Sequence, residues 1–181
     1  MWLHSHNDSP ILTPSTKAEY GEHDEPISRS KIVGGLVEES IYSLAESYAL
    51  KLFSAGQEWA EKQGLILVDT KYEFGVDEHG VVTLIDEVHT CDSSRYWFAE
   101  TYEQRFADGK EPDKYDKDVV RDYIKKTVDD PYQHTEFDVP DKVKDNTTQV
   151  YVDFYRCLTD DTSILTSLNE DIENPVMLNQ E

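Results

Sequence analysis

The sequence is poor in cysteine, and it has no long hydrophobic run. Its two cysteines, Cys91 and Cys157, are too few for a disulfide framework or a closed zinc site. No apolar run approaches the ~20 residues that a membrane span requires. The first residues, Met-Trp-Leu-His-Ser-His, lack the cationic start and apolar segment of a signal peptide. We therefore expect a cytoplasmic protein without a membrane partner.

Basic residues are also scarce. There are 17 Lys and Arg residues against 38 Asp and Glu residues, which gives a formal net charge of -21. Nucleic-acid binding depends on cations that displace counterions from phosphates, so this balance argues against a nucleic-acid partner. A solvated acidic surface is the plain interpretation, and mimicry of an anionic polymer is the alternative. A phosphate-binding site in such a chain needs local cations or Mg²⁺ to reverse the field.

The length and composition indicate one folded domain with flanking segments. A hydrophobic content of 38% supplies a core, so bulk disorder is not expected. Residues 1–30 are rich in turn formers and predict a loop-rich arm. The segment 31–160 carries the periodic patterns of a folded body, and 161–181 is an acidic extension with weak periodicity.

Apolar spacing predicts three helices. Positions at three- and four-residue steps predict a helix from about Ser40 to Gln63, with Gly64 after it as a C-terminal cap. The same pattern predicts a helix over 117–126 and a last helix from about 141 to 158.

Between the first two of these helices, the pattern is that of strands. Residues 65–69 and 71–74 predict a strand whose Leu-Ile-Leu-Val opening is buried on both faces. A turn over 77–80 and a return strand over 81–88 complete an antiparallel hairpin.

This hairpin carries a row of charged residues. Asp69, Lys71 and Glu73 are two apart, so on one strand they share a face, and Asp86 lies on the return strand. Neighbouring carboxylates repel one another unless a cation lies between them, and Mg²⁺ takes one or two protein carboxylates. Glu73 and Asp86 suit that role, whereas Lys71 is kept charged by its acidic neighbours. A surface ladder of cross-strand ion pairs is the alternative.

The segment Asp92-Ser-Ser-Arg95 follows the return strand. Hydroxyls beside an arginine favour phosphate binding, because a guanidinium presents several donors in a fixed fork. An Asx-turn is the structural alternative.

Two motifs closely resemble the signatures of the SAICAR synthetase (phosphoribosylaminoimidazole-succinocarboxamide synthase) family of purine biosynthesis. They are Leu-Ile-Leu-Val-Asp-Thr-Lys-Tyr-Glu-Phe-Gly at 65–75 and Ile-Asp-Glu-Val-His-Thr-Cys-Asp-Ser-Ser-Arg-Tyr-Trp at 85–97. Segments 14–24 and 115–123 are also similar to that family. The likeness spans roughly residues 9–158, and motifs of this length rarely recur by chance.

The resemblance implies an ATP-dependent ligation. The carboxylate of carboxyaminoimidazole ribonucleotide (CAIR) is phosphorylated by ATP, and L-aspartate displaces the phosphate from the acyl-phosphate. The family's roles fall on nine residues of this chain. They are Glu73 and Asp86 for Mg²⁺, Asp69 and Lys71 at the reacting centre, Asp92, Ser94 and Arg95 on the ribonucleotide, and Lys17 and Asp24 closing over it.

The implied fold is α+β, an antiparallel sheet with helices packed on its outer face, and 31–160 is then the catalytic lobe. The family's amino-terminal ATP-binding lobe has no counterpart in this sequence. We therefore expect another chain or self-association to supply it. The alternative is a truncated, non-catalytic homologue that binds a nucleotide or a partner protein.

Overall fold

The computed structural model describes residues 9–17, 24–115, 118–128 and 138–159. The chain divides into two compact units, Met1–Lys114 and Tyr115–Glu181. Among the described residues, no helix is both long and apolar enough to cross a bilayer. The predicted extension 161–181 lies outside the described residues.

The first unit contains three helices, α1 (Arg29–Val33), α2 (Glu39–Lys62) and α3 (Ala99–Ala107). The helix predicted from about Ser40 to Gln63 is confirmed as α2. Gly64 follows α2 with φ +72°, a conformation that glycine adopts without the strain of a side chain. Sequence patterns did not predict α1 or α3.

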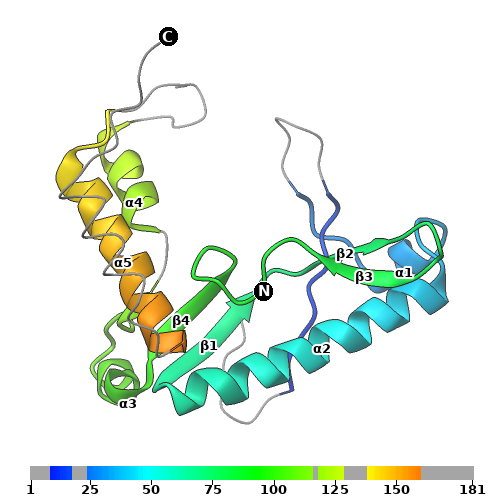
Figure 1. Ribbon diagram of the computed structural model, residues 1–181, viewed down its shortest axis with the longest axis horizontal. Helices are drawn as coiled ribbons and strands as arrows, with labels where there is room; N and C mark the ends of the chain where they lie inside the picture. Colours follow the sequence, from blue (N-terminus) through cyan, green and yellow to red (C-terminus); the bar gives the residue numbers. More distant parts are fainter. Residues whose placement is uncertain (1–8, 18–23, 116–117, 129–137, 160–181) are drawn as a thin grey trace. The chain divides into compact units, whose positions relative to one another are not determined.

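The strands form two small antiparallel sheets, and the predicted α+β class is confirmed (Figure 1). In one sheet, β1 (Leu65–Thr70) pairs with β4 (Ser94–Phe98), which pairs with the short β5 (Lys114–Tyr115). In the other, β2 (Glu73–Val76) pairs with β3 (Val82–Ile85).

The prediction of one continuous strand through 65–74 was wrong. The chain leaves β1 after Thr70 and enters β2 at Glu73, so Lys71 and Tyr72 form a linker between the sheets. The backbone N–H of Lys71 donates to the carbonyl of Ser93, 2.9 Å away, in the loop before β4. The hairpin turn at 77–80 is confirmed, but β1 takes β4 as its partner instead of the return strand.

The core of the first unit lies between β1 and α2, which pack against each other (Figure 1). Leu65, Leu67 and Val68 are buried on the strand, and Phe53 and Ala60 are buried on the helix. The β1–β4 register shifts between Leu67 and Asp69, which is a β-bulge. A bulge breaks the two-residue alternation, and so consecutive side chains of β1 are buried.

The second unit contains α4 (Asp118–Thr127) and α5 (Asp141–Thr159), which pack against each other. Both helices match their predicted ranges closely. Within this unit the rings of Tyr115 and Phe154 meet edge to face, with their centroids 5.8 Å apart. This contact fixes the start of the unit on α5.

Gly56 on α2 leaves space for a neighbouring ring, and this predicts the effect of a substitution. A Cβ at position 56 would lie 2.7 Å from Nε2 of His89 and 2.8 Å from Cδ2 of Leu67. We expect Gly56→Ala to lower the free energy of unfolding by about 1–3 kcal/mol, because overpacking outweighs the helix preference of alanine. Urea unfolding measures the change. Ser54→Ala, at an exposed position of the same helix, is the control and should stay within about 0.5 kcal/mol of wild type.

Candidate functional site

A cluster of charged side chains surrounds the linker between β1 and β2. The ammonium of Lys71 lies 2.9 Å from the carboxylate of Glu73 and 3.6 Å from that of Asp24. The ammonium of Lys17, from the amino-terminal arm, lies 2.5 Å from the same Glu73 carboxylate. The Glu73 carboxylate therefore forms ion pairs with two ammonium groups, and its side chain is only 16% exposed.

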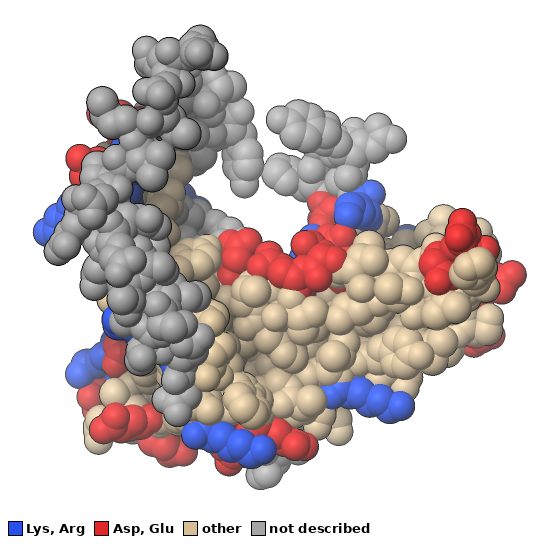
Figure 2. Space-filling model, in the orientation of Figure 1, with Lys and Arg blue, Asp and Glu red and all other residues tan. Residues whose placement is uncertain are grey.

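Asp86 is linked to this cluster only through a small effect of its charge on Lys17. Hydrogen bonding to Glu73 raises the pKa of Lys17, and the charge of Asp86 acts in the same direction. The two lysines in turn lower the pKa of Glu73, mainly through hydrogen bonds from Lys17 and Lys71. Glu73 and Asp86 thus act on one ammonium. On the face shown in Figure 2, acidic side chains gather where β1 gives way to β2, with a basic side chain beside them.

The sequence analysis placed Asp86 on the return strand, and this prediction was wrong. Asp86 follows the last residue of β3, and its φ of +67° turns the chain into the loop that leads to β4. A non-glycine residue adopts this conformation only at a cost, so surrounding contacts must hold it.

Glu73 and Asp86 offer the type of ligand atom that a magnesium ion prefers. Both supply carboxylate oxygens, and Mg²⁺ takes one or two such ligands and completes its shell with water and phosphate oxygens. Lys17 already brings a positive charge to this place. Within the described ranges, no group of three or more His, Cys, Asp or Glu residues is arranged to hold a metal ion. Glu73 and Asp86 would therefore need water or phosphate oxygens as further ligands.

Asp69 and Arg95 form an ion pair between β1 and β4. Nε of Arg95 donates to Oδ1 of Asp69 over 2.8 Å, and Nη2 donates to Oδ2. The register places the two residues opposite each other, directly after the bulge. Their side chains are 12% and 31% exposed. The sequence assigned them to different parts of a substrate, whereas the structure joins them to each other.

Ser94 is the first residue of β4, and Asp92 lies in the loop before it. The Ser94 hydroxyl is buried and lies 2.8 Å from that of Thr70 across the sheet. Thr90 closes the loop, because its Oγ1 accepts hydrogen bonds from the backbone N–H groups of Asp92 and Ser93 at 3.3 and 3.2 Å. The segment is therefore a hydroxyl-closed turn that runs into a strand.

Sequence patterns missed three residues that hold this region together. The Tyr72 hydroxyl is hydrogen-bonded to Nε2 of His89, and their rings meet edge to face at 5.6 Å. The Tyr96 hydroxyl donates to the carbonyl of His89 over 2.8 Å. His89 has φ +57°. Glycine is the usual residue in this left-handed conformation, so a histidine gives no sequence signal for it.

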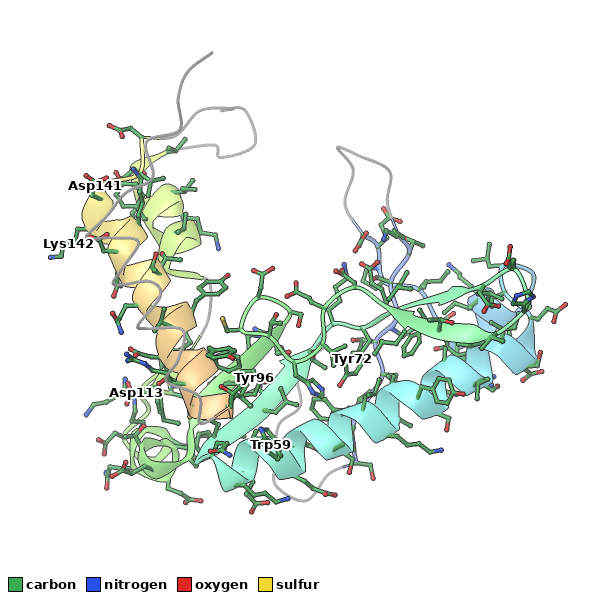
Figure 3. All side chains as sticks on the ribbon, in the orientation of Figure 1. Trp59, Tyr72, Tyr96, Asp113, Asp141 and Lys142 are labelled. Atoms are coloured by element: carbon green, nitrogen blue, oxygen red, sulfur yellow. The ribbon has the colours of Figure 1, made fainter. Side chains whose placement is uncertain are left out.

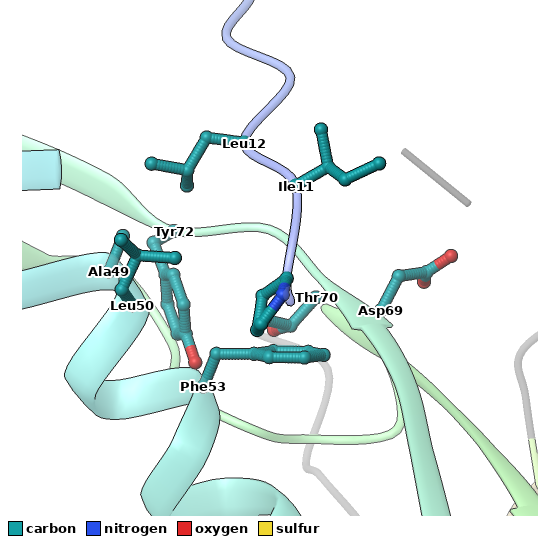
Figure 4. A pocket seen from close by; sticks show the side chains of 9 residues that line it. Ile11, Leu12, Ala49, Leu50, Phe53, Asp69, Thr70 and Tyr72 are labelled. Atoms are coloured by element: carbon teal, nitrogen blue, oxygen red, sulfur yellow. The ribbon is translucent and has the colours of Figure 1, made fainter. Parts of the chain in front are cut away.

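A small pocket lies under the amino-terminal arm, next to this cluster (Figure 4). Its volume is about 40 Å³, which is room for little more than one or two water molecules. In Figure 4, Ile11 and Leu12 of the arm lie over Phe53 of α2, with Thr70 and Tyr72 beside them. The pocket seats the arm and is too small for a nucleotide.

Comparison with solved structures defines the class of fold. The SAICAR synthase of Saccharomyces cerevisiae, solved in complex with SAICAR, superposes with a TM-score of 0.66 at 35% sequence identity. The match covers 84% of this chain and 47% of the yeast chain. The fold is thus that of one half of a purine-biosynthesis ligase.

The family model described as SAICAR synthetase matches residues 4–137, and the chain belongs to this family. A putative phosphoribosylaminoimidazole-succinocarboxamide synthase of Mesorhizobium japonicum is 45% identical over 152 residues, which are 83% of this chain and 48% of the relative. The chloroplastic synthase of Arabidopsis thaliana is 52% identical over 124 residues, which are 68% of this chain and 29% of the relative. The chain spans about half the length, or less, of the curated relatives it matches.

The Asp69–Arg95 pair yields a prediction about stability. Asp69→Asn should lower the free energy of unfolding by about 1.5–3 kcal/mol, because it weakens two charge-assisted hydrogen bonds of a mostly buried guanidinium. Urea unfolding measures the loss. Asp153→Asn removes a charge from the Arg156 pair on α5, whose side chains are more than one third exposed, and it should change stability by less than about 0.5 kcal/mol. Equal losses in both variants would contradict the prediction.

Burial of His89 predicts a dependence of stability on pH. Burial lowers the pKa of His89 below its ordinary value, so the unfolded chain binds a proton more readily than the folded one. The stabilisation is present above the ordinary histidine pKa of about 6.5 and is lost as the pH falls below it. Urea unfolding at steps from pH 7.5 to 5 should show a loss in wild type that is smaller in His89→Phe. His79→Asn, on the exposed hairpin turn, serves as the control and should keep the wild-type slope.

Proposed function

We propose that this chain supplies the substrate and metal half of a site that ligates L-aspartate to CAIR with ATP, giving SAICAR through an acyl-phosphate. The observation that carries the proposal is the cluster in which the ammonium groups of Lys17 and Lys71 meet the carboxylate of Glu73. Membership of the SAICAR synthetase family, a ligase family that uses ATP and Mg²⁺, supports it.

In this proposal Glu73 and Asp86 hold the magnesium ion. When bound, the ion neutralises charge on the ATP phosphates, which a chain with a net charge of -21 would otherwise repel. With the ion on Glu73, Lys17 would pair with phosphate oxygens instead of with Glu73. Asp24 and Lys17 close the site from the arm.

Lys71 stabilises the charge that develops at the reacting carboxylate. Its side chain is 60% exposed, and its ammonium is anchored by Glu73 and Asp24. Hydrogen bonding to Glu73 raises the pKa of Lys71, so it stays protonated at neutral pH. A cation held at the reacting centre lowers the barrier to phosphoryl transfer and to attack on the acyl-phosphate.

Arg95, Asp92 and Ser94 bind the ribonucleotide in this proposal, with Arg95 on its 5′-phosphate. The bidentate contact with Asp69 fixes the plane of the guanidinium, which pre-organises an arginine for an anion. Asp69 faces the reacting carboxylate in this proposal, and it also holds Arg95 in place. These assignments follow the motif residue by residue.

The ATP-binding lobe of the relatives is supplied, in this proposal, by a further polypeptide segment or by self-association. The β2–β3 hairpin supports this, because a two-stranded sheet is marginal without further packing. Val76, Val81 and Ile85 of this hairpin are 48%, 55% and 43% exposed. We also propose the cytoplasm as location and no nucleic acid or membrane as partner, in line with the charge.

A second function is a non-catalytic homologue that binds a nucleotide or a partner protein. The existing ion pairs favour this function, since the Glu73 carboxylate is already paired with two lysines and the Asp69 carboxylate is already paired with Arg95. Nucleotide binding without turnover would then suffice to retain the motifs.

Calorimetry and an ADP assay separate the two functions. Purified chain is titrated with CAIR, Mg-ATP and L-aspartate separately, and ADP release is then measured with all three. The ligase proposal expects binding of CAIR and ADP release that needs all substrates, with or without added amino-terminal lobe of a relative. Ribonucleotide binding without ADP release in either mixture favours the second function. Binding of no ligand contradicts the ligase proposal and the nucleotide-binding alternative, and leaves only a protein that binds a partner protein or acts through its acidic surface.

Lys71 and Lys110 offer a matched pair of variants. Their side chains are 60% and 61% exposed, so neither substitution should affect folding. We expect Lys71→Met to lower ADP release at least 100-fold, since it removes the cation from the reacting centre, and to change CAIR affinity less than 5-fold, about 1 kcal/mol. Lys110→Met should match wild type in both measurements. Normal ADP release by Lys71→Met would exclude the proposed role.

A further inference from the structure

His89 is held in place from three elements that are distant in sequence. The linker contributes the Tyr72 hydroxyl to Nε2, and β4 contributes the Tyr96 hydroxyl to the carbonyl over 2.8 Å. On α2, the absence of a side chain at Gly56 admits the ring. A residue so surrounded keeps its left-handed backbone conformation, φ +57°, at a defined place in the loop.

The loop 86–93 and the linker are joined at two points. The backbone N–H of Lys71 donates to the carbonyl of Ser93 over 2.9 Å, and the next residue, Tyr72, reaches His89 through its side chain. Figure 4 shows the Tyr72 ring extending from the linker towards α2. In Figure 3, Tyr72 lies between the linker and α2.

Hydrogen bonds within the loop hold its remaining residues together. The hydroxyl of Thr90 donates to Glu87, and the backbone N–H of Ser94 donates to the carbonyl of Thr90 over 3.0 Å. A loop that is internally tied moves as one piece, so its position is set by the points at which it meets the linker. Asp86 stands at one end of this piece and Asp92 at the other.

We propose that His89 is a positioning residue: bonded to Tyr72, its ring locks loop 86–93 against the linker and so sets Asp86 relative to Lys71 and Glu73. The loop and the linker each carry part of the charged cluster, and no strand pairing joins β3 to β1. The claim that this spacing serves a ligand rests on the proposed function, whereas the lock itself does not.

The chemistry of the pair suits a lock. Burial raises the pKa of the Tyr72 hydroxyl, which therefore stays a donor, and lowers the pKa of His89, which therefore stays neutral. A neutral imidazole that accepts at Nε2 carries its proton on Nδ1. Removal of either partner leaves the other polar group buried without this bond, which is costly.

Native-state amide exchange followed by NMR tests the lock. The reporter is the amide of Lys71, which bonds to the loop directly, and the amides of α2 report global opening. We expect Tyr72→Phe and His89→Leu to raise the exchange rate of Lys71 and Ser94 at least 10-fold relative to α2. His89→Gln, whose amide reaches the place of Nε2, should stay within about 3-fold of wild type.

Tyr48→Phe is the matched control, since Tyr48 also meets the ring of Phe74 from α2 but lies about two turns before Gly56, where the His89 ring packs. It should leave the Lys71 amide at the wild-type rate. Unchanged exchange at Lys71 in Tyr72→Phe and His89→Leu would overturn the proposal. Equal acceleration in α2 and at Lys71 would also overturn it, because it would reduce His89 to a contributor to global stability.

Calorimetry with Mg-ATP separates this inference from the proposed function. If wild type binds Mg-ATP, Tyr72→Phe should bind it 3- to 10-fold more weakly, and Tyr48→Phe should not differ from wild type. Equal affinity in Tyr72→Phe and wild type would overturn the positioning role. If wild type does not bind Mg-ATP with or without the added amino-terminal lobe of a relative, the metal assignment fails, and the exchange rates alone decide whether the lock exists.

Discussion

The hydrogen bond from the Lys71 backbone to the Ser93 carbonyl marks the point on which the arrangement of charges depends. Here the chain leaves the β1–β4 sheet and begins the β2–β3 sheet. The two short sheets are connected by this two-residue linker and by the loop 86–93, and no common ladder fixes their spacing. Side-chain contacts across the linker must therefore do what strand pairing does within a sheet.

Charge sets a second constraint. A chain with a net charge of -21 cannot leave three carboxylates together without compensation, and Lys17 and Lys71 supply it. Both lysines are more than half exposed, so solvent screens their pairs with Glu73, and these pairs contribute little to stability. Exposed counterions of this kind exchange readily with solvent ions, whereas the Asp69–Arg95 pair is more buried.

Much of the fold could be predicted because its signals are local. The period of α2 and its terminal Gly64, and the turn at 77–80, follow from nearby residues alone. The break at Lys71 could not be predicted, since the alternation of Asp69, Lys71 and Glu73 continues through it unchanged. The sheet ends there because β1 pairs with β4, a partner 24 or more residues away, and a bulge shifts the register.

The candidate site was predictable to the same extent. Lys71 and Glu73 meet, as two-residue spacing suggests, although they no longer share one strand. The Asp69–Arg95 pair depends on the β4 register, which the sequence did not reveal. His89 was missed for a further reason: its role comes from a left-handed backbone and from the missing side chain of Gly56. Neither feature has meaning until α2, the linker and the loop are brought together, so the residues that place the charges were harder to find than the charges themselves.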